Sequence, residues 1–557
     1  MVIDSSSAQA EKDPPSSELT GATVLRVVAL LVCALVLFRH AWVSDDAFIT
    51  LRTVRNLLEG DGLRWNLNER VQGYTHPLWM FLLALPYAFI PDPIVATLLL
   101  SLGLSVATLY LVAFRLRLPA PASLLALAVL VSSKSFVDYS TSGLENPLTH
   151  FLAVLLLAQH LHGVEGEGDP ALASRRQAFR VAFLAGLMAL NRLDSVIFAF
   201  PFLVSSFWTL RGSLRIAGKI LVAGFAPLLA WEIFSVVYYG FPFPNTAYAK
   251  LGSEIPASQL WLQGLFYTLS QIEFDPISLL AIGCALVLFA IRRERRLYPL
   301  VFGLLLYLTY ILSIGGDFMA GRFFSLPLLA VALLLAHLLR ERLARPDAVA
   351  YLPAAAVLAV GLLLTPHPTL GGNVEYALPT NAISKNLWDE RGVCDERAYY
   401  APSSAFVHAS RTTPLPEDWR KARGLRMSPT AIELVAQAGV AGFYAPPTTI
   451  IVDGYGLNDA FLARLPAADK VTWRVGHYAR LVPRGYTESI KEGRNRLADP
   501  ALARFYDRIR LVISGPIWSW QRWKEIVRLA LGIEPPAPLP LPKSIPMQPA
   551  KPPTALK

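Results

Sequence analysis

Asp45 and Asp46 are the residues of this chain best placed to act as an acid or a base. They follow directly after the first long apolar run, residues 23–42. A free aspartate has a pKa of about 3.9, so at least one member of the pair should be ionised at neutral pH. An ionised carboxylate can accept a proton from a substrate hydroxyl. Adjacent helical residues point about 100° apart, so we expect the second acid to have a separate task, such as orienting the substrate or holding a divalent cation. The structural alternative is that both acids form ion pairs with Arg52 and Arg55.

Basic residues in later polar segments have the chemistry to bind a phosphate group. The guanidinium of arginine presents a fork of donors that matches phosphate oxygens, and lysine or histidine can add single hydrogen bonds. For each basic residue, the structural alternative is an ion pair or a cation at the membrane surface. The candidates for binding phosphate or sugar are His76, Arg192, Lys250 and Arg322. The polar residues expected to support them are Tyr74, Glu145, Asp194, Asn245 and Asp317.

These candidates lie in polar segments that separate long apolar runs. Of the 557 residues, 54% are hydrophobic and only 17% are charged, whereas about 25% charged residues is usual for a soluble domain. Since a membrane-spanning helix needs roughly 20 apolar residues, the sequence predicts a polytopic α-helical membrane protein with about eleven spans. The expected spans are residues 23–42, 94–114, 120–137, 147–162, 179–191, 194–210, 217–239, 276–291, 297–314, 322–340 and 348–366.

The short apolar run at residues 77–90 decides the topology. About 14 residues are too few to cross a bilayer, so we interpret this run as a helix at the membrane surface. The basic loops between Arg115 and Arg345 then all fall on one side, which the positive-inside rule assigns to the cytoplasm. The N-terminus is therefore expected in the cytoplasm, and the candidate residues outside it.

The composition divides the chain into four parts. Residues 1–22 are expected to be a disordered cytoplasmic leader, and residues 23–366 a transmembrane domain whose first outer loop is 43–93. Residues 367–533 are expected to form an extracytoplasmic α/β domain, and the proline-rich residues 534–557 a disordered tail.

Local patterns within the C-terminal domain add detail. They predict a helix at 430–442 and strands at 449–453 and 479–482. The tryptophan-rich residues 517–524 look amphipathic, and we expect them either at the membrane surface or against the core of the domain.

The charge distribution excludes some functions. The net charge is +10, but the basic residues lie in short loops between apolar runs, so nucleic acid is not an expected partner. The three cysteines show no disulfide or metal-binding spacing. The middles of the spans are nearly free of charges, which disfavours an ion-coupled transporter.

The convergence of acids and cations on one face of an apolar bundle fits a lipid-linked phosphate substrate. Its lipid tail would lie among the helices, while its phosphate would meet the cations. A lipid or glycan transporter and a non-catalytic glycan-binding membrane protein remain as alternatives.

Several motifs resemble the family of mycobacterial arabinofuranosyltransferase B. The resemblance starts in the first outer loop, with residues 45–49, 65–66, 69–72 and 74–79. Further matching segments are residues 244–250, 315–322, 451–457 and 473–477.

This family belongs to the GT-C superfamily of membrane glycosyltransferases, so the resemblance implies a GT-C-like fold in a bacterial plasma membrane. It also implies an essential acid in the first outer loop, at Asp45 or Asp46. The implied partners are a polyprenyl-phosphate-linked sugar donor, with arabinofuranose as a candidate sugar, and a cell-envelope glycan acceptor. No cofactor is implied with certainty, and a divalent cation would be held by Asp45 or Asp46.

Overall fold

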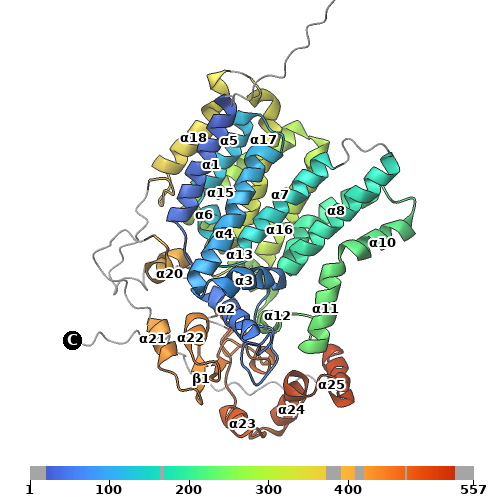
Figure 1. Cartoon of the computed structure of the whole chain (residues 1–557), viewed down its shortest axis with the longest axis vertical. Helices are drawn as coiled ribbons and strands as arrows, with labels where there is room; N and C mark the ends of the chain where they lie inside the picture. The colour runs from blue at the N-terminus through green and yellow to red at the C-terminus, as the bar shows by residue number, and fades with distance from the viewer. Residues whose placement is uncertain are drawn as a thin grey trace, which may run out of the picture.

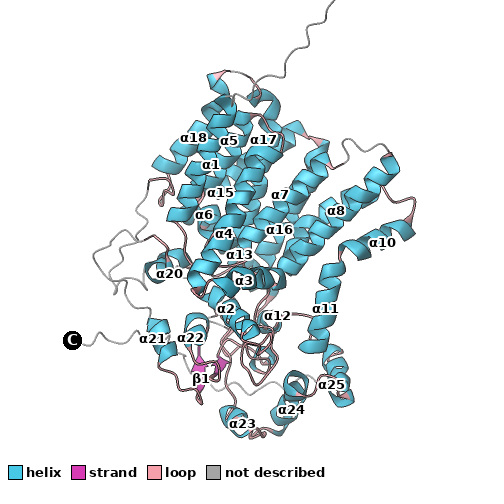
Figure 2. Cartoon of the chain, in the orientation of Figure 1, coloured by secondary structure: helices cyan, strands magenta, loops and turns pink. Residues whose placement is uncertain are grey.

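The structure is a computed structural model, and it describes residues 21–163, 169–345, 347–371, 391–407, 419–470 and 473–533. The expected tail at 534–557 and all but the last two residues of the expected leader lie outside this part of the chain. Helix α1 begins at Gly21, so residues 21 and 22 already belong to the first helix. Figure 2 shows that helices make up most of the described structure, with loops concentrated in its lower part.

An apolar helical bundle forms the larger part of the molecule (Figure 1). Within the described ranges, four helices are long and apolar enough to cross a membrane: α1 (Gly21–Arg39), α4 with its extension η1 (Pro93–Arg115), η3 with α16 (Arg295–Ser313), and η4 with α17 (Arg322–Leu343). Two bent pairs raise this number to six: α10 with α11 (Leu214–Tyr238), and α13 and α14 with α15 (Ala257–Arg292). The other helices of the bundle are α5 (Ala120–Ser132), α6 (Lys134–Tyr139), α7 (Asn146–His162), α8 (Pro170–Asn191), η2 (Leu193–Ser195), α9 (Val196–Trp208), η5 (Ala348–Tyr351) and α18 (Leu352–Leu363).

Each expected span coincides with one of these helices or helix pairs, but eleven crossings remain a prediction because several helices are short. The clearest short case is α3 (Pro77–Phe89), with 13 residues. Such a helix is about 20 Å long, against about 30 Å for the hydrocarbon core. Figure 1 shows α3 at the end of the bundle beside α2 (Asp45–Leu58), which supports its interpretation as a helix that does not cross.

Two expected spans are interrupted. The one at 120–137 breaks at Ser133, whose hydroxyl donates to Asp275 at 2.5 Å, and Asp275 also accepts the amide of Ser135 at 3.0 Å. The one at 217–239 bends by 61° between α10 and α11. At this bend Gly224 packs so closely on Ala182 that an added Cβ would lie 2.5 Å from the alanine Cβ.

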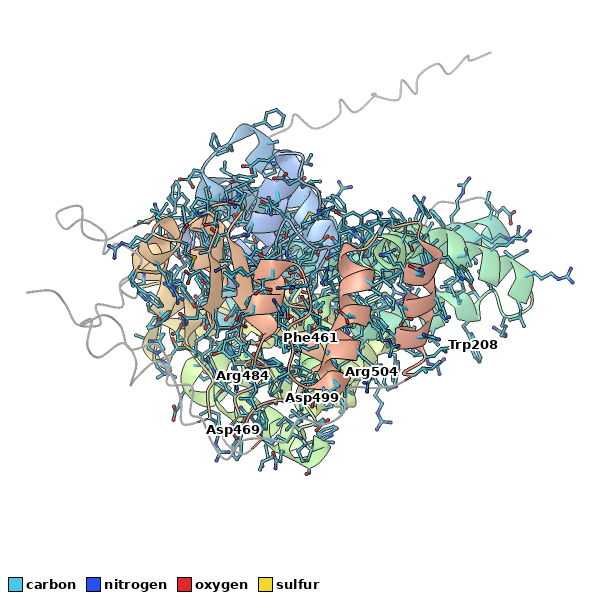
Figure 3. All side chains as sticks on the ribbon, turned by 90° about the horizontal axis from the view of Figure 1, so that it is seen from below. Trp208, Phe461, Asp469, Arg484, Asp499 and Arg504 are labelled. Atoms are coloured by element: carbon cyan, nitrogen blue, oxygen red, sulfur yellow. The ribbon has the colours of Figure 1, made fainter. Side chains whose placement is uncertain are left out.

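Below the bundle, the C-terminal region (residues 391–533) packs around a small parallel sheet. Strand β1 (Ile432–Val435) pairs with β2 (Ile450–Asp453), with Ile432 opposite Ile450. Viewed from below, Phe461 lies near the middle of this region (Figure 3), where it is buried in an apolar cluster. The helices of this region are α20 (Glu396–Ser404), α21 (Trp419–Leu425), α22 (Gly439–Tyr444), η6 (Leu462–Arg464), α23 (Tyr486–Glu492), α24 (Pro500–Ser514) and α25 (Trp520–Ala530).

The local predictions for this region were right only in part. The strand expected at 449–453 is confirmed as β2. The helix expected at 430–442 is wrong over its first half, which forms β1, because a short apolar run fits either element and pairing with β2 decides between them. At 479–482 the structure has only an isolated bridge from Arg480 to Ala467.

The first loop, which covers residues 40–92 in the structure, packs tightly against the C-terminal region. Arg52, on α2 (Asp45–Leu58), is fully buried and donates to the carbonyls of Trp65 at 2.9 Å and Thr449 at 3.0 Å. Arg55 donates to the carbonyl of Phe443 at 2.6 Å, at the C-terminal end of α22. These arginines therefore hold the two parts together and do not pair with the acids at the start of α2, which overturns the structural alternative for that pair.

Candidate functional site

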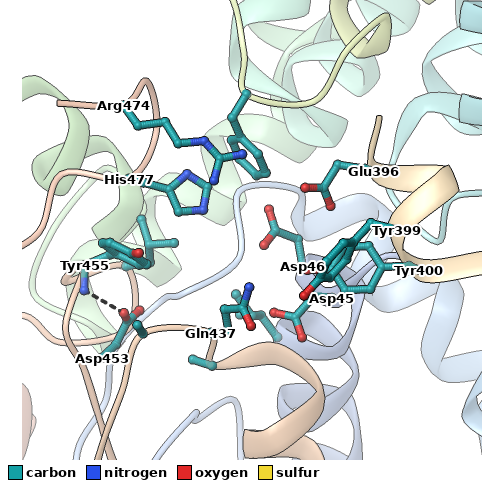
Figure 4. Close-up of a pocket in the computed structure, with 15 residues that line it drawn as sticks. Asp45, Asp46, Glu396, Tyr399, Tyr400, Gln437, Asp453, Tyr455, Arg474 and His477 are labelled. Atoms are coloured by element: carbon teal, nitrogen blue, oxygen red, sulfur yellow. Dashed lines mark hydrogen bonds between the residues drawn. The ribbon is translucent and has the colours of Figure 1, made fainter. Parts of the chain in front are cut away.

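A cleft of about 530 Å³, partly open to solvent, lies where the start of α2 meets the C-terminal region (Figure 4). One wall comes from the first loop and from the loop before α17, and the other from α20, the segment after β1 and the loops after β2. The lining residues are Asp45, Asp46, Ile49, Phe318, Glu396, Tyr399, Tyr400, Ala436, Gln437, Ala438, Asp453, Tyr455, Leu457, Arg474 and His477.

The side chain of Asp45 forms a structural contact with the start of α22 (Gly439–Tyr444). Its carboxylate accepts the backbone amides of Val440 at 2.8 Å and Gly439 at 3.1 Å, the first residues of α22. A side chain at Gly439 would not fit, because its Cβ would lie 1.9 Å from the carbonyl oxygen of Asp45. Asp45 therefore joins α2 to α22.

Asp46 points into the cleft and is only half-buried. Among the residues that the structure describes, none forms a hydrogen bond or ion pair with it. Burial, and then the charge of Asp45, raise its pKa to about 6, against the effect of Arg322 and Lys250. Asp46 is therefore ionised at neutral pH, yet it is a stronger base than an ordinary aspartate.

Glu396 faces Asp46 across the cleft, and Figure 4 shows their carboxyl groups pointing toward one another. Glu396 is buried at the start of α20 and forms no hydrogen bond within the described ranges. Burial and the charge of Asp46 raise its pKa well above the ordinary value, although Arg474 opposes this. This shift favours the protonated form of Glu396, which can donate a hydrogen bond.

Aromatic and basic side chains form the wall opposite the bundle. The ring of His477 packs edge-on against Phe318 at 4.2 Å and Tyr455 at 4.9 Å. Burial and nearby Arg474 hold the pKa of His477 well below its usual range, so its ring is neutral. Arg474 donates to the carbonyl of Gly392 at 2.7 Å. This wall offers flat rings, a neutral imidazole and a guanidinium, which suit a sugar.

Beside the cleft, three of the four predicted basic residues meet around Glu145. This buried carboxylate accepts from Arg192 at 2.7 Å and from Arg322 at 3.1 Å, and it lies 3.2 Å from Nδ1 of His76. The other ring nitrogen of His76 lies 2.7 Å from the hydroxyl of Thr50 on α2. The network thus connects the bundle to the helix that carries Asp46.

Each arginine also has a second acidic partner. Arg192 contacts Asp194 at 2.7 Å, and Arg322 contacts Asp317 at 3.3 Å. Arg192 and Arg322 therefore each form an ion pair with an aspartate close to them in sequence, which is the structural alternative to phosphate binding.

Lys250 differs from these arginines. It is exposed, at the end of α12 (Asn245–Leu251), and no hydrogen bond or ion pair joins it to the part of the chain that the structure describes. It lies within electrostatic range of Asp46 and Asp317. Lys250 is therefore the predicted cation that is most open to a ligand.

None of the five supporting residues lines the cleft, and two of them, Tyr74 and Asn245, also lie outside the Glu145 network. The hydroxyl of Tyr74 lies 2.9 Å from that of Tyr239. Asn245 donates to the carbonyls of Gly456 at 2.8 Å and Leu457 at 3.1 Å. Both side chains are thus used in internal contacts.

Sequence reasoning missed Glu396 and Gln437 as residues of the cleft, and it named Asp453, Arg474 and His477 only as parts of segments that carry the family resemblance. A lone acid at the start of a helix carries no signal in a single sequence, and only the packing of α20 brings Glu396 to Asp46.

The structure gives no support for a metal site: within the described ranges, no group of three or more His, Cys, Asp or Glu side chains is arranged to hold an ion.

Comparison with known proteins adds relatives in sequence and in fold. No family model matches the chain. A terminal beta-(1->2)-arabinofuranosyltransferase of Corynebacterium glutamicum is 29% identical over 333 residues, which are 52% of this chain and 47% of the relative. The protein of the same name from Mycobacterium tuberculosis is 28% identical over 416 residues, which are 67% of this chain and 64% of the relative. The chain thus spans from about half to just under two thirds of the length of these relatives.

Among solved structures, the crystal structure of ArnT from Cupriavidus metallidurans bound to undecaprenyl phosphate is similar, with a TM-score of 0.51 and 13% sequence identity. The match covers 79% of this chain and 87% of ArnT. The chain is therefore a multi-pass membrane protein with a GT-C fold like that of ArnT, and its sequence resembles those of arabinofuranosyltransferases.

Proposed function

We propose that the chain is a glycosyltransferase that moves a sugar from a polyprenyl-phosphate donor to a cell-envelope glycan on the outer membrane face. The observation that carries this proposal is the position of Asp46, which has no hydrogen-bond or ion-pair partner in the described structure. It lines a cleft with aromatic rings and lies within electrostatic range of the exposed Lys250. The names of the relatives support arabinofuranose as the sugar.

The proposed reaction transfers one proton and one glycosyl group. Asp46 accepts the proton of the acceptor hydroxyl. The hydroxyl oxygen forms a bond to the anomeric carbon of the donor while the bond from this carbon to the phosphate oxygen breaks. The electron pair of the broken bond leaves with the polyprenyl phosphate, whose negative charge Lys250 stabilises. Glu396, as a neutral acid, donates a hydrogen bond to a sugar oxygen beside the reacting centre.

The Glu145 network gives this site its rigidity. Arg192 and Arg322 are held by carboxylates, so we assign them mainly to fixing the first loop against the bundle. Arg322 acts on Asp46 through its charge, which opposes the rise in the pKa of that acid.

The test is a transfer assay with purified full-length protein, a polyprenyl-phosphate-linked arabinofuranose and an arabinan acceptor. Wild-type protein is expected to release polyprenyl phosphate only when an acceptor is present, and Asp46→Asn to lose this activity. Full activity of Asp46→Asn would overturn the proposal. If the protein binds the acceptor but releases no polyprenyl phosphate from any lipid-linked sugar, the result would favour a glycan-binding protein instead.

A further inference from the structure

Helix α25 buries two charged side chains next to the apolar Ile526, and it exposes large apolar side chains on its other side. Arg522 is 0% exposed and Glu525 is also buried, whereas Trp520 is 79% exposed and Leu531, just after the helix, is 69% exposed. A helix on the surface of a soluble domain turns its apolar side chains inward and its charges outward. The outward face of α25 is therefore suited to an apolar surrounding.

The buried charges of α25 fix its orientation. Arg522 donates to the carbonyls of Val512 at 2.8 Å, Val237 at 2.9 Å and Tyr238 at 3.1 Å. Glu525 accepts from Arg508 at 2.7 Å. Rotating the helix to hide its apolar side chains would break these bonds and leave two charges buried without partners, which is costly.

Exposed apolar side chains lie just before α25, along it and just after it, and we call this set the stripe. Lys524 is exposed on the same side of the helix, between Trp520 and Val527. Tryptophan and lysine are typical of the layer where lipid headgroups meet acyl chains. The stripe consists of Trp518, Trp520, Val527, Leu531 and Ile533.

Helix α25 lies against the end of α11, a position that is consistent with a contact between α25 and the membrane surface. Val237 and Tyr238, which accept from Arg522, lie at the C-terminal end of α11, and Figure 1 shows α25 at the foot of that helix. Helix α11 is the second half of a bent apolar pair that is long enough to cross a membrane, and its Ile233 is exposed. The helix that carries the stripe therefore lies against the end of an apolar helix that itself exposes an apolar side chain.

We propose that the stripe of α25 lies in the headgroup layer of the leaflet that the end of α11 reaches, with its rings at the acyl boundary and Lys524 at the lipid phosphates. This contact fastens the C-terminal region, and with it one wall of the cleft, to the membrane surface. A lipid-linked substrate would then meet both walls without leaving the bilayer.

The test uses nitroxide labels on the full-length protein in nanodiscs of phosphatidylethanolamine and phosphatidylglycerol. Cys284→Ser removes the exposed cysteine, since Cys33 and Cys394 are buried. Labels are then placed at Leu531→Cys, on the stripe, and at Gln521→Cys, an exposed position of α25 to the side of it. Collisions with oxygen report lipid, and collisions with a water-soluble nickel complex report solvent.

We expect the label at 531 to favour oxygen and the label at 521 to favour nickel, with a ratio that differs at least several-fold between them. Equal access of nickel to both positions would overturn the proposal. Shielding of position 531 from both reagents would also overturn it, because that result indicates a protein partner or a second copy of the chain.

Discussion

The carboxylate of Asp45 accepts a hydrogen bond from the backbone amide of Val440 at 2.8 Å, which connects the first loop to a residue almost 400 positions further along the chain. Its neighbour Asp46 has no such contact within the described structure and faces the cleft. Two adjacent acids that look equivalent in the sequence therefore have different environments, one structural and one open to substrate.

This difference predicts opposite phenotypes for two matched substitutions. Asp46→Asn should lower kcat by about 10²- to 10⁴-fold, the usual contribution of a general base, with little change in thermal stability. Asp45→Asn places an amide against the backbone donors of α22, and should lower the free energy of unfolding by about 1–3 kcal/mol. Both effects are measured on purified protein, by donor turnover and by thermal unfolding in detergent. Loss of turnover without loss of stability in Asp45→Asn would make Asp45 the base.

The raised pKa of Asp46 predicts the acidic limb of the pH profile. A carboxyl whose pKa is about 6 takes up a proton as the pH falls through that value and can then no longer act as a base. Below this pH, we expect kcat/KM to decrease about tenfold for each pH unit. An ordinary aspartate would instead place this decrease below a pH of about 4. The residual activity of Asp46→Asn should lack this limb. A wild-type limb two units lower would contradict the environment described for Asp46.

Lys250 offers a test of phosphate binding that does not disturb the fold. Because no hydrogen bond or ion pair in the described structure depends on Lys250, Lys250→Met should leave the melting temperature nearly unchanged. A charge-assisted hydrogen bond contributes about 1.5–3 kcal/mol, so KM for the lipid-phosphate donor should rise about 10- to 150-fold. Lys491→Met, at an exposed position of α23, is the control and should change neither value. An unchanged KM in Lys250→Met would remove Lys250 from the donor site.

Arg192 should behave in the opposite way, as a stabilising residue. Arg192→Met leaves Glu145 buried with one partner fewer, and breaking a buried ion pair costs about 3–5 kcal/mol. We expect a clear fall in thermal stability, with activity lost in parallel at higher temperature. The matched control is Arg211→Met, since Arg211 is exposed at the end of α9. Unchanged stability together with a raised donor KM would instead assign Arg192 to phosphate.

The bundle could be predicted because hydrophobicity is local to each helix, but its breaks could not. The break at Ser133 depends on Asp275, which is distant in sequence and becomes an acceptor only after the chain has folded. Strand β1 was mistaken for a helix for a similar reason, since its partner β2 decides its conformation. Local patterns thus give the number and order of the apolar elements, and long-range polar contacts give their interruptions.

The site divides in the same way. The acids of the first loop could be found because two adjacent carboxylates directly after an apolar run are unusual. Glu396 could not be found, because its position depends on contacts of its neighbours: Asp395 meets Lys134 at 3.3 Å, and Arg397 meets Asp138 at 3.6 Å. These ion pairs hold α20 against the bundle, and only then does the side chain between them face the cleft.

Glu396 therefore gives the sharpest test of the proposed chemistry. Because burial and the charge of Asp46 keep its carboxyl protonated, the group should act as a hydrogen-bond donor and not as a base. Glu396→Gln retains a donor of nearly the same shape and should keep most of the activity, whereas Glu396→Ala removes the donor and should lower kcat/KM by about tenfold or more. Both variants keep Asp395 and Arg397, so their thermal stabilities should stay close to that of the wild type. If Glu396→Gln is as inactive as Asp46→Asn, then Glu396 works in its ionised form and shares the role of base. If neither variant changes kcat/KM, Glu396 does not touch the substrate.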